Sequence, residues 1–373
     1  YVSTMRGRAT LPERDRQAIV AAVNAADSGL IVCGPSDRPA PERTALSALA
    51  RASGFPVVAD PLSGHRFGPH VNDISVCGGY DGYLSAIETT PDVVVRFGAS
   101  PTSKPLRNYL AEAGGRQFLV DPAGGWREAT FTATDLVVAD ETRLASALAS
   151  ALDREAGPYA ARLAEAESIY WEHIEGKEPA EGAVLADVAR LAPDPATLFV
   201  SNSMPIRDLD RFGKPRAVAL TVLGNRGASG IDGITSTALG AGYGTTDPLV
   251  LVTGDLAYYH DMNGLLAVAR AGVDATIVCL NNDGGGIFHL LPIEDHDSFG
   301  EWFRTPHGLD FAPSADLYDL AFARTDNRGE FRDLYRESLG GEGTRVIEVM
   351  TDSQRNHDER RELEETVVEE LSE

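Results

Sequence analysis

Two polar segments that each follow an apolar run carry the residue types of a divalent-cation site. Gly254-Asp255-Leu256-Ala257 closes one run and Asn281-Asn282-Asp283-Gly284 closes the next, so Asp255 and Asn282 lie 27 residues apart (282 − 255). That spacing fits one strand–helix–strand unit, which places both side chains at the carboxyl ends of neighbouring parallel strands, where open α/β sheets bind ligands. A carboxylate, an amide oxygen and a backbone carbonyl at Gly284 form a hard oxygen set of low charge. Such a set favours Mg²⁺ held together with substrate phosphates.

Each of these residues also has a purely structural explanation. Asp255 is a favoured type for a helix cap, and Asn282 is a favoured type for a turn. Their spacing, with a glycine next to each motif, favours the metal site over these two readings. The histidines 65, 70, 260 and 289 have no ligand spacing, so no zinc site is predicted.

A second group of residues is cationic. The glycine-rich segment 225–233 lies between a predicted strand and a predicted helix, and it can present Arg226 to an anion while its backbone N–H groups approach a diphosphate. Segment 202–208 follows another strand, and Ser203 and Arg207, four residues apart, lie on one face of a helical turn. The alternative for either arginine is a surface position.

The elements that must hold these segments alternate between short apolar strands and amphipathic helices, which predicts an α/β chain with two doubly wound parallel-sheet domains. Strands are expected over 29–33, 56–59, 92–97, 117–120 and 136–138, and then over 198–202, 217–222, 249–253, 275–280 and 345–349. Helices are expected over 42–51, 106–113, 142–152, 159–175, 182–191, 235–243, 256–271, 315–323 and 330–339, with a terminal helix in 352–373. Gly157-Pro158 punctuates the chain, so the predicted domains are 1–156 and 157–373.

The charge balance excludes several classes of partner. The chain has 373 residues with 33 basic and 56 acidic side chains, a net charge of −23, which disfavours nucleic acid and anionic membrane surfaces. Only three of the basic residues are lysine, and this acid-rich, lysine-poor composition predicts a halophilic source. There is no long apolar run or signal-peptide pattern, so no membrane insertion is expected. Cys33 and Cys279 lie in apolar runs and are expected in the core of a protein of the reducing cytoplasm.

The polar segments resemble those of thiamine diphosphate enzymes, whose motif is Gly-Asp, a helix and strand, and then Asn-Asn. Leu256 stands where many members carry glycine. Segments 202–208, 225–240, 254–266 and 281–288 are similar, more narrowly, to the 2-succinyl-5-enolpyruvyl-6-hydroxy-3-cyclohexene-1-carboxylate synthases of menaquinone biosynthesis.

The resemblance implies a transferase that decarboxylates 2-oxoglutarate and adds the remaining succinyl-semialdehyde unit to isochorismate. The implied cofactors are thiamine diphosphate and Mg²⁺ or Mn²⁺, and the implied assembly is a cytoplasmic homodimer or homotetramer. Residues 1–156 resemble the central, transhydrogenase-like domain, and residues 157–373 resemble the diphosphate- and metal-binding domain. The pyrimidine-binding domain, which carries the activating glutamate, has no counterpart in the sequence, so we expect an inactive fragment and assign no catalytic residue.

The resemblance also assigns roles to residues. Substrate contacts are expected from Ser203, Arg207, Arg226, Lys104, Ile287, Phe288 and Leu291. Cofactor contacts are expected from Asn202, Ser229, Ile231, Gly254, Asp255, Leu256 and Asn282, and metal ligation from Asp255, Asn282 and Gly284. For the apolar residues, core packing is the alternative. Beside Lys104, Pro105 replaces the arginine of compared members, a cation that Arg107 could supply.

Two other functions fit the same residues. One is a different thiamine diphosphate carboligase, similar to acetolactate synthase, which would consume pyruvate. The other is a non-catalytic binding or regulatory fragment that keeps the fold.

Overall fold

The computed structural model describes residues 2–5 and 7–372, so Tyr1, Arg6 and Glu373 of the predicted domains lie outside the described residues. By its internal contacts the chain divides into two units. The first comprises Tyr1–Glu172, Pro215–Ala217 and Val367–Glu373, and the second comprises His173–Lys214 and Val218–Thr366. Each unit contains one six-stranded sheet in which every strand pairing is parallel, which confirms the predicted fold class.

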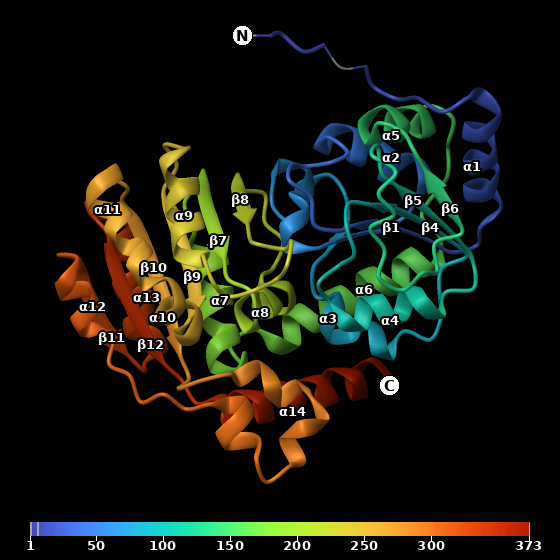
Figure 1. The fold of residues 1–373 in the computed structure, drawn as a ribbon. Coiled ribbons are helices and arrows are strands. Elements are labelled where there is room, and N and C mark those ends of the chain that lie inside the picture. The colour runs from blue at the N-terminus through green and yellow to red at the C-terminus, as the bar shows by residue number, and fades with distance from the viewer. Residues whose placement is uncertain (1, 6, 373) are drawn as a thin grey trace. The chain divides into compact units, whose positions relative to one another are not determined.

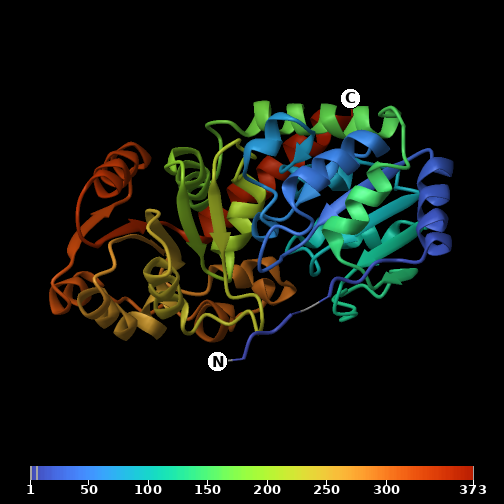
Figure 2. The same cartoon turned by 90° about the horizontal axis from the view of Figure 1, so that it is seen from above.

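The first unit has the sheet order β3-β2-β1-β4-β5-β6. Its strands are β1 (Gly29–Cys33), β2 (Val57–Ala59), β3 (Val76–Cys77), β4 (Val93–Phe97), β5 (Arg116–Val120) and β6 (Asp135–Val137). Its helices are α1 (Glu13–Ala25), α2 (Arg43–Ser53), α3 (Tyr80–Tyr83), α4 (Lys104–Glu112), α5 (Glu141–Ala149) and α6 (Pro158–Ile174). Helices α1, α2 and α5 cover one face of the sheet, and α3, α4 and α6 lie toward the other (Figures 1 and 2).

The second unit has the order β11-β12-β10-β9-β7-β8. Its strands are β7 (Ala196–Val200), β8 (Leu220–Leu223), β9 (Leu249–Gly254), β10 (Ala275–Asn281), β11 (Ala321–Thr325) and β12 (Arg345–Met350). Its helices are α7 (Ala180–Leu191), α8 (Met204–Phe212), α9 (Ile234–Tyr243), α10 (Asp255–Asp261), α11 (Leu266–Ala271), α12 (Ala312–Leu317) and α13 (Arg328–Gly340). Helix α7 contacts both α8 and α13, whereas α9 contacts α10 and α11, so the two sets cover opposite faces.

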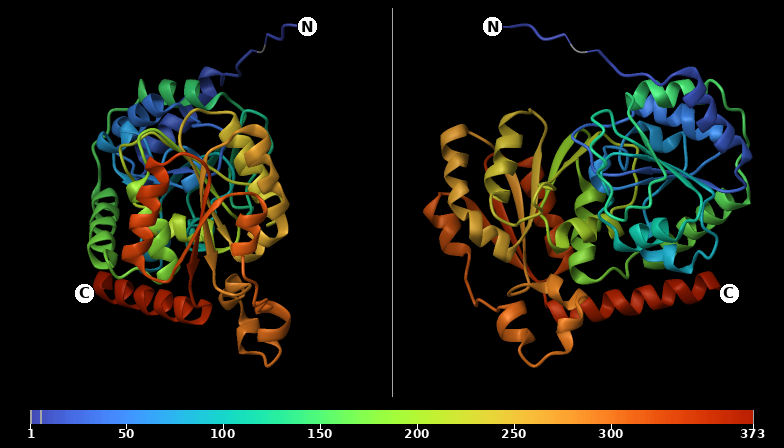
Figure 3. Two further views of the ribbon diagram at one scale, coloured as in Figure 1. Left: turned by 90° about the vertical axis from the view of Figure 1, so that its left-hand side faces the viewer. Right: turned by 45° about the vertical axis from the view of Figure 1, so that its right-hand side comes forward.

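The last helix, α14 (Ser353–Ser372), runs straight in Figure 3. It buries Leu363, Val367 and Leu371, the apolar positions four residues apart that the sequence offers for packing. Cys33, Cys77 and Cys279 are buried, which confirms the core positions predicted for Cys33 and Cys279.

Three predicted elements are corrected. The first sheet has a sixth strand, β3, which is only two residues long. The helix predicted over 315–323 is wrong beyond Leu317, because Ala321–Thr325 pairs in parallel with β12 as the edge strand β11. The single helix predicted over 256–271 is broken by a 3-10 turn, Met262–Leu265, where Gly264 lies against Ser236.

The contact-based units place most of α6 with the first sheet, whereas the predicted boundary precedes this helix. The physical reason is the half-buried Glu167, whose carboxylate accepts hydrogen bonds from the backbone N–H groups of Gly78 and Gly79 at 2.6 and 3.1 Å. Which segments serve as domains in the sense of the family stays a prediction.

Candidate active site at the second sheet

The carboxyl ends of four adjacent strands collect most of the predicted site residues. β8, β7, β9 and β10 are neighbours and run parallel, so they end at one edge of the sheet. Arg226, Asn202, Asp255 and Asn282 follow these four strands in that spatial order. The chain order reverses between β7 and β9, which makes this edge a topological switch point, the usual ligand position in such sheets.

Asp255 contacts both the first turn of its own helix and the loop after the neighbouring strand. Its Oδ2 accepts the backbone N–H of Gly284 at 2.9 Å, and its Oδ1 accepts that of Leu256 at 2.6 Å. The imidazole of His307 lies 3.2 Å from the same Oδ2. Burial raises the pKa of the Asp255 carboxyl, and the N–H groups and His307 oppose that rise. The helix-cap alternative therefore describes only the contact with Leu256, and not those with Gly284 and His307.

Asn282 does more than form a turn. Its Nδ2 donates to Glu181 Oε1 at 2.8 Å, and Glu181 precedes it by 101 residues. Its Oδ1 is buried and has no hydrogen-bond partner among the described residues. An unpaired buried acceptor costs about 1–3 kcal/mol, and a cation would satisfy it. The amide oxygen of Asn282 therefore fits the predicted metal-ligand role.

The glycines after Asn282 are required by close approaches. Gly284 has φ +139°, and a Cβ there would lie 2.1 Å from the carbonyl oxygen of Arg304. A Cβ at Gly286 would lie 2.8 Å from Asn282 Nδ2. The following turns lie beside the start of α14 (Figure 3), where His289 Nε2 is 3.2 Å from Ser353 Oγ. Glycine at these two positions therefore lets the loop pack closely against Arg304 and Asn282.

Asn202 joins the cationic loop to the end of β7. Its Oδ1 accepts a hydrogen bond from Arg226 Nη1 at 2.8 Å. Its Nδ2 donates to the carbonyl oxygens of Asn225 at 2.6 Å and Gly230 at 2.8 Å. The structure thus brings together Asn202 and Arg226, which the sequence separates by 24 residues, and it fixes one arm of the guanidinium at the sheet edge.

Ser203 and Arg207 also meet, as their spacing predicts. Arg207 Nη1 donates to the carbonyl oxygen of Ser203 at 2.6 Å at the start of α8. Ser203 has φ +71°, a left-handed conformation that side-chain-bearing residues adopt at a cost of about 1–3 kcal/mol. Such backbone strain is common at ligand sites.

The other predicted residues of this unit divide by exposure. Ser229 is exposed with φ +58°, whereas Ile231 is half-buried and packs against the apolar core of the unit. Gly254 and Leu256 are half-buried beside Asp255. Ile287 and Phe288 are half-buried, Phe288 stacks edge-on to Phe303, and Leu291 is exposed. These exposed or half-buried positions leave the side chains accessible to a ligand.

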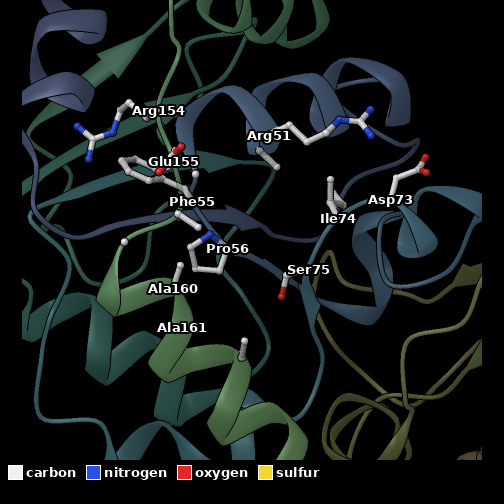
Figure 4. Close-up of a pocket in the computed structure, with 15 residues that line it drawn as sticks. Arg51, Phe55, Pro56, Asp73, Ile74, Ser75, Arg154, Glu155, Ala160 and Ala161 are labelled. Atoms are coloured by element: carbon white, nitrogen blue, oxygen red, sulfur yellow. The ribbon is translucent and has the colours of Figure 1, made fainter.

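Lys104 belongs to the first unit, where it is exposed as the first residue of α4, after β4. That unit also contains a cavity of about 510 Å³ at the amino ends of β2 and β3 (Figure 4), away from the predicted residues. Arg154 beside it donates to the carbonyl oxygens of Asn24 and Ala26, both at 2.6 Å, and lies over the Phe55 ring. This cation therefore has a structural role, and the cavity is not assigned to the site.

Sequence reasoning missed the side chains that surround the motif from distant segments. His307 contacts Asp255, and Glu181 holds Asn282. Burial and the Asp208 carboxylate raise the pKa of Glu181 to about 7, despite its hydrogen bonds from Asn282 and Thr351. Neither residue belongs to a spaced motif, so no local pattern in the sequence could have pointed to them.

Within residues 2–5 and 7–372, no group of three or more His, Cys, Asp or Glu side chains is arranged to hold a metal ion. The predicted ligand set is of a different kind, because it contains only one carboxylate, with an amide oxygen and a backbone carbonyl.

Comparison with known proteins agrees with this geometry. Residues 214–349 match the family model "Thiamine pyrophosphate enzyme, C-terminal TPP binding domain". A 2-succinyl-5-enolpyruvyl-6-hydroxy-3-cyclohexene-1-carboxylate synthase of Natronomonas pharaonis is 73% identical over 95% of this chain and 60% of its own length. The synthases of Haloarcula marismortui and a Roseiflexus species are 58% and 43% identical, over 100% and 93% of this chain and 64% and 60% of their own lengths. Over nearly its whole length the chain is similar to these synthases.

The chain spans about three fifths of the length of the curated synthases it matches. The match to the thiamine pyrophosphate model contains Arg226, Asp255, Asn282 and Gly284, whereas Asn202, Ser203, Arg207 and Lys104 lie outside it. Synthases of the halophilic archaea Natronomonas, Haloarcula and Halobacterium are among these relatives, in agreement with the predicted halophilic origin. None of the described helices has both the length and the apolar character needed to cross a membrane.

Proposed function

We propose that the chain provides the diphosphate- and metal-binding part of a decarboxylating carboligase that joins 2-oxoglutarate to isochorismate in menaquinone biosynthesis. The observation that carries this proposal is the convergence of Asn202, Arg226, Asp255 and Asn282 at one sheet edge. The names of the relatives and the matched cofactor-binding domain support it. No contact observed here favours an acetolactate synthase-like or a purely regulatory role.

Asp255, the Oδ1 of Asn282 and the carbonyl oxygen of Gly284 would hold Mg²⁺ or Mn²⁺, as hard oxygen ligands do. Asn202, Ser229, Ile231, Gly254 and Leu256 would contact thiamine diphosphate. When bound, the cofactor supplies the electron sink for decarboxylation and carbon–carbon bond formation.

The remaining residues would bind and orient substrates. Ser203, Arg207 and Arg226 would bind the carboxylates of 2-oxoglutarate and isochorismate, since a guanidinium pairs with a carboxylate through two parallel hydrogen bonds. Asn202 limits the freedom of Arg226, so less entropy is lost when a substrate binds. Ile287, Phe288 and Leu291 would exclude water, and from the resemblance alone Lys104 is proposed as a further cation that contacts substrate.

The proposed protein is a cytoplasmic homodimer or homotetramer. Its net charge of −23 repels phosphate, so we propose that it binds no nucleic acid.

The test is an assay of the full-length enzyme with 2-oxoglutarate, isochorismate, thiamine diphosphate and Mg²⁺. We expect CO₂ release with both substrates, and Asp255→Ala should abolish Mg²⁺-dependent cofactor binding in calorimetry. Consumption of pyruvate in place of 2-oxoglutarate would contradict the substrate assignment, and unchanged cofactor affinity in the variant would contradict the ligand assignment.

A further inference from the structure

The two asparagines that end and follow β10 are each held by a buried glutamate from a distant segment. Asn281 Nδ2 donates to Glu348 Oε1 at 2.7 Å, and Asn282 Nδ2 donates to Glu181 Oε1 at 2.8 Å. Glu348 and Glu181 are 0% and 2% exposed. Two adjacent amides therefore have the same kind of anchor.

The two amide oxygens have different surroundings. Asn281 Oδ1 accepts the backbone N–H of Asp283 at 3.0 Å and so shapes the turn. Asn282 Oδ1 is buried and finds no partner in the described chain. Both arms of the Asn281 amide are thus hydrogen-bonded within the fold, whereas the Asn282 amide oxygen stays available as an acceptor at the sheet edge.

A carboxylate fixes which way an amide points. Glu181 Oε1 accepts a hydrogen bond from Asn282 Nδ2, so this contact selects the N–H arm of the amide and not its carbonyl oxygen. Because the two arms of an amide diverge, anchoring Nδ2 on Glu181 turns Oδ1 away from that carboxylate. An apolar side chain at position 181 would leave both orientations open.

Glu181 is itself held in place. It lies in the first turn of the twelve-residue helix α7, where the N-terminal dipole favours negative charge. Its backbone N–H donates to Asn356 Oδ1 at 3.0 Å, and its Oε1 also accepts Thr351 Oγ1 at 3.1 Å. The anchor for Asn282 is therefore rigid.

We propose that Glu181 is a positioning residue that presents the amide oxygen of Asn282 to a divalent cation. This inference rests on the metal site of the proposed function. It assigns to Glu181 no contact with cation or substrate. Outer-sphere partners of this kind typically change metal affinity 10- to 100-fold when removed.

The first test needs neither a variant nor a metal. In the chain labelled with ¹⁵N-asparagine, the Asn282 side-chain NH₂ should exchange with solvent far more slowly than that of Asn108, which is exposed. Its signal is assigned by its loss in Asn282→Ser. Exchange as fast as that of Asn108 would overturn the inference.

The second test compares Mn²⁺ affinity by electron paramagnetic resonance, with thiamine diphosphate present, in three variants. Glu181→Leu removes the acceptor and should weaken binding about 10- to 100-fold. Glu181→Gln keeps an acceptor oxygen and should restore most of the affinity. Asp333→Asn is the control, because Asp333 is an exposed carboxylate of α13 that pairs with Arg336, so this variant should bind like wild type.

Equal Mn²⁺ affinity of Glu181→Leu and wild type would overturn this inference and leave the proposed metal site standing. An affinity loss in Glu181→Gln as large as in Glu181→Leu would also overturn it, because charge and not amide orientation would then be responsible. If wild type itself binds no Mn²⁺, the proposed metal site fails and the inference fails with it. If Glu181→Leu does not fold, the exchange measurement on wild type and the comparison of Glu181→Gln with wild type decide.

Discussion

At the scale of single residues, His65 shows how burial controls ionisation. Its side chain is fully buried beside His70, with the two rings edge-on at 5.7 Å. Burial, helped by the nearby charges of His70 and Arg43, lowers the pKa of His65 to about 3. The folded chain therefore keeps this imidazole neutral at pH values where the unfolded chain protonates it.

This difference predicts a pH dependence of stability. Between about pH 6.5 and 3 the unfolded state binds a proton at His65 that the folded state does not, so the free energy of unfolding falls as pH falls, by about 1.4 kcal/mol per pH unit at most. His65→Gln removes this titrating group, so the free energy of unfolding should fall less steeply as pH falls, by up to about 1.4 kcal/mol per pH unit. Urea unfolding of both proteins from pH 7 to pH 4, at fixed salt, checks this, and parallel curves would contradict it.

Some residues of the site could be predicted from the sequence, and others could not. Asp255 and Asn282 could be predicted because a strand–helix–strand unit fixes their spacing, and the structure indeed places them after β9 and β10. Glu181 and His307 could not, because their contacts depend on tertiary packing between segments that share no motif. Local spacing predicts ligands on adjacent strands but not the side chains that support them.

At the scale of elements, α13 is fastened to α7 by one buried carboxylate. Asp187 on α7 is 0% exposed and accepts hydrogen bonds from Arg328 and Arg332 of α13 at 2.8 and 2.7 Å, and from Arg190 at 2.9 Å. Burial opposes ionisation, but the three guanidinium groups together hold the pKa of Asp187 below its ordinary value. The contribution of Asp187 to stability is therefore complete above about pH 4 and is lost as pH falls through its lowered pKa.

Asp187→Asn should lower the free energy of unfolding at pH 7 by about 1.5–3 kcal/mol, because the three partly exposed guanidinium groups are left with a neutral partner. The matched control is Asp333→Asn, also in α13, whose exposed pair with Arg336 at 3.0 Å should contribute less than about 1 kcal/mol. Denaturant unfolding measures both. Similar losses in the two variants would show that Asp187 does not clamp the helices.

Most elements of the two sheets could be predicted because buried parallel strands are short apolar runs between amphipathic helices. β3 could not, because two residues are too few for any periodicity. β11 was mistaken for helix because it is an edge strand with mostly exposed or half-buried residues and an alanine-rich sequence. The break after Asp261 depends on a tertiary contact, since the Asp261 carboxylate accepts hydrogen bonds from Ser236 of α9 at 2.6 and 2.9 Å.

At the scale of the whole molecule, the two signs of charge are used differently. Several arginines lie inside the fold in ion pairs, such as Arg96 with Glu128 and Arg360 with Asp208, whose side chains are nearly inaccessible. Much of the acidic excess is on the surface, and α14 alone exposes Glu362, Glu365, Glu369 and Glu370. Repulsion among surface carboxylates of a chain with net charge −23 therefore opposes folding at low ionic strength.

Salt should relieve this repulsion. At about 1 M KCl the Debye length is about 3 Å, shorter than most distances between surface charges, so the melting temperature should rise steeply between about 0.1 and 1 M KCl. Replacing the four exposed glutamates of α14 by glutamine removes four of the 23 excess negative charges and leaves −19 (−23 + 4), which should make this rise shallower. Calorimetric melting in a KCl series compares the two proteins. If the melting temperature rises equally with KCl in both proteins, salt acts through the apolar core and not through surface charge, because the two proteins bury the same apolar groups.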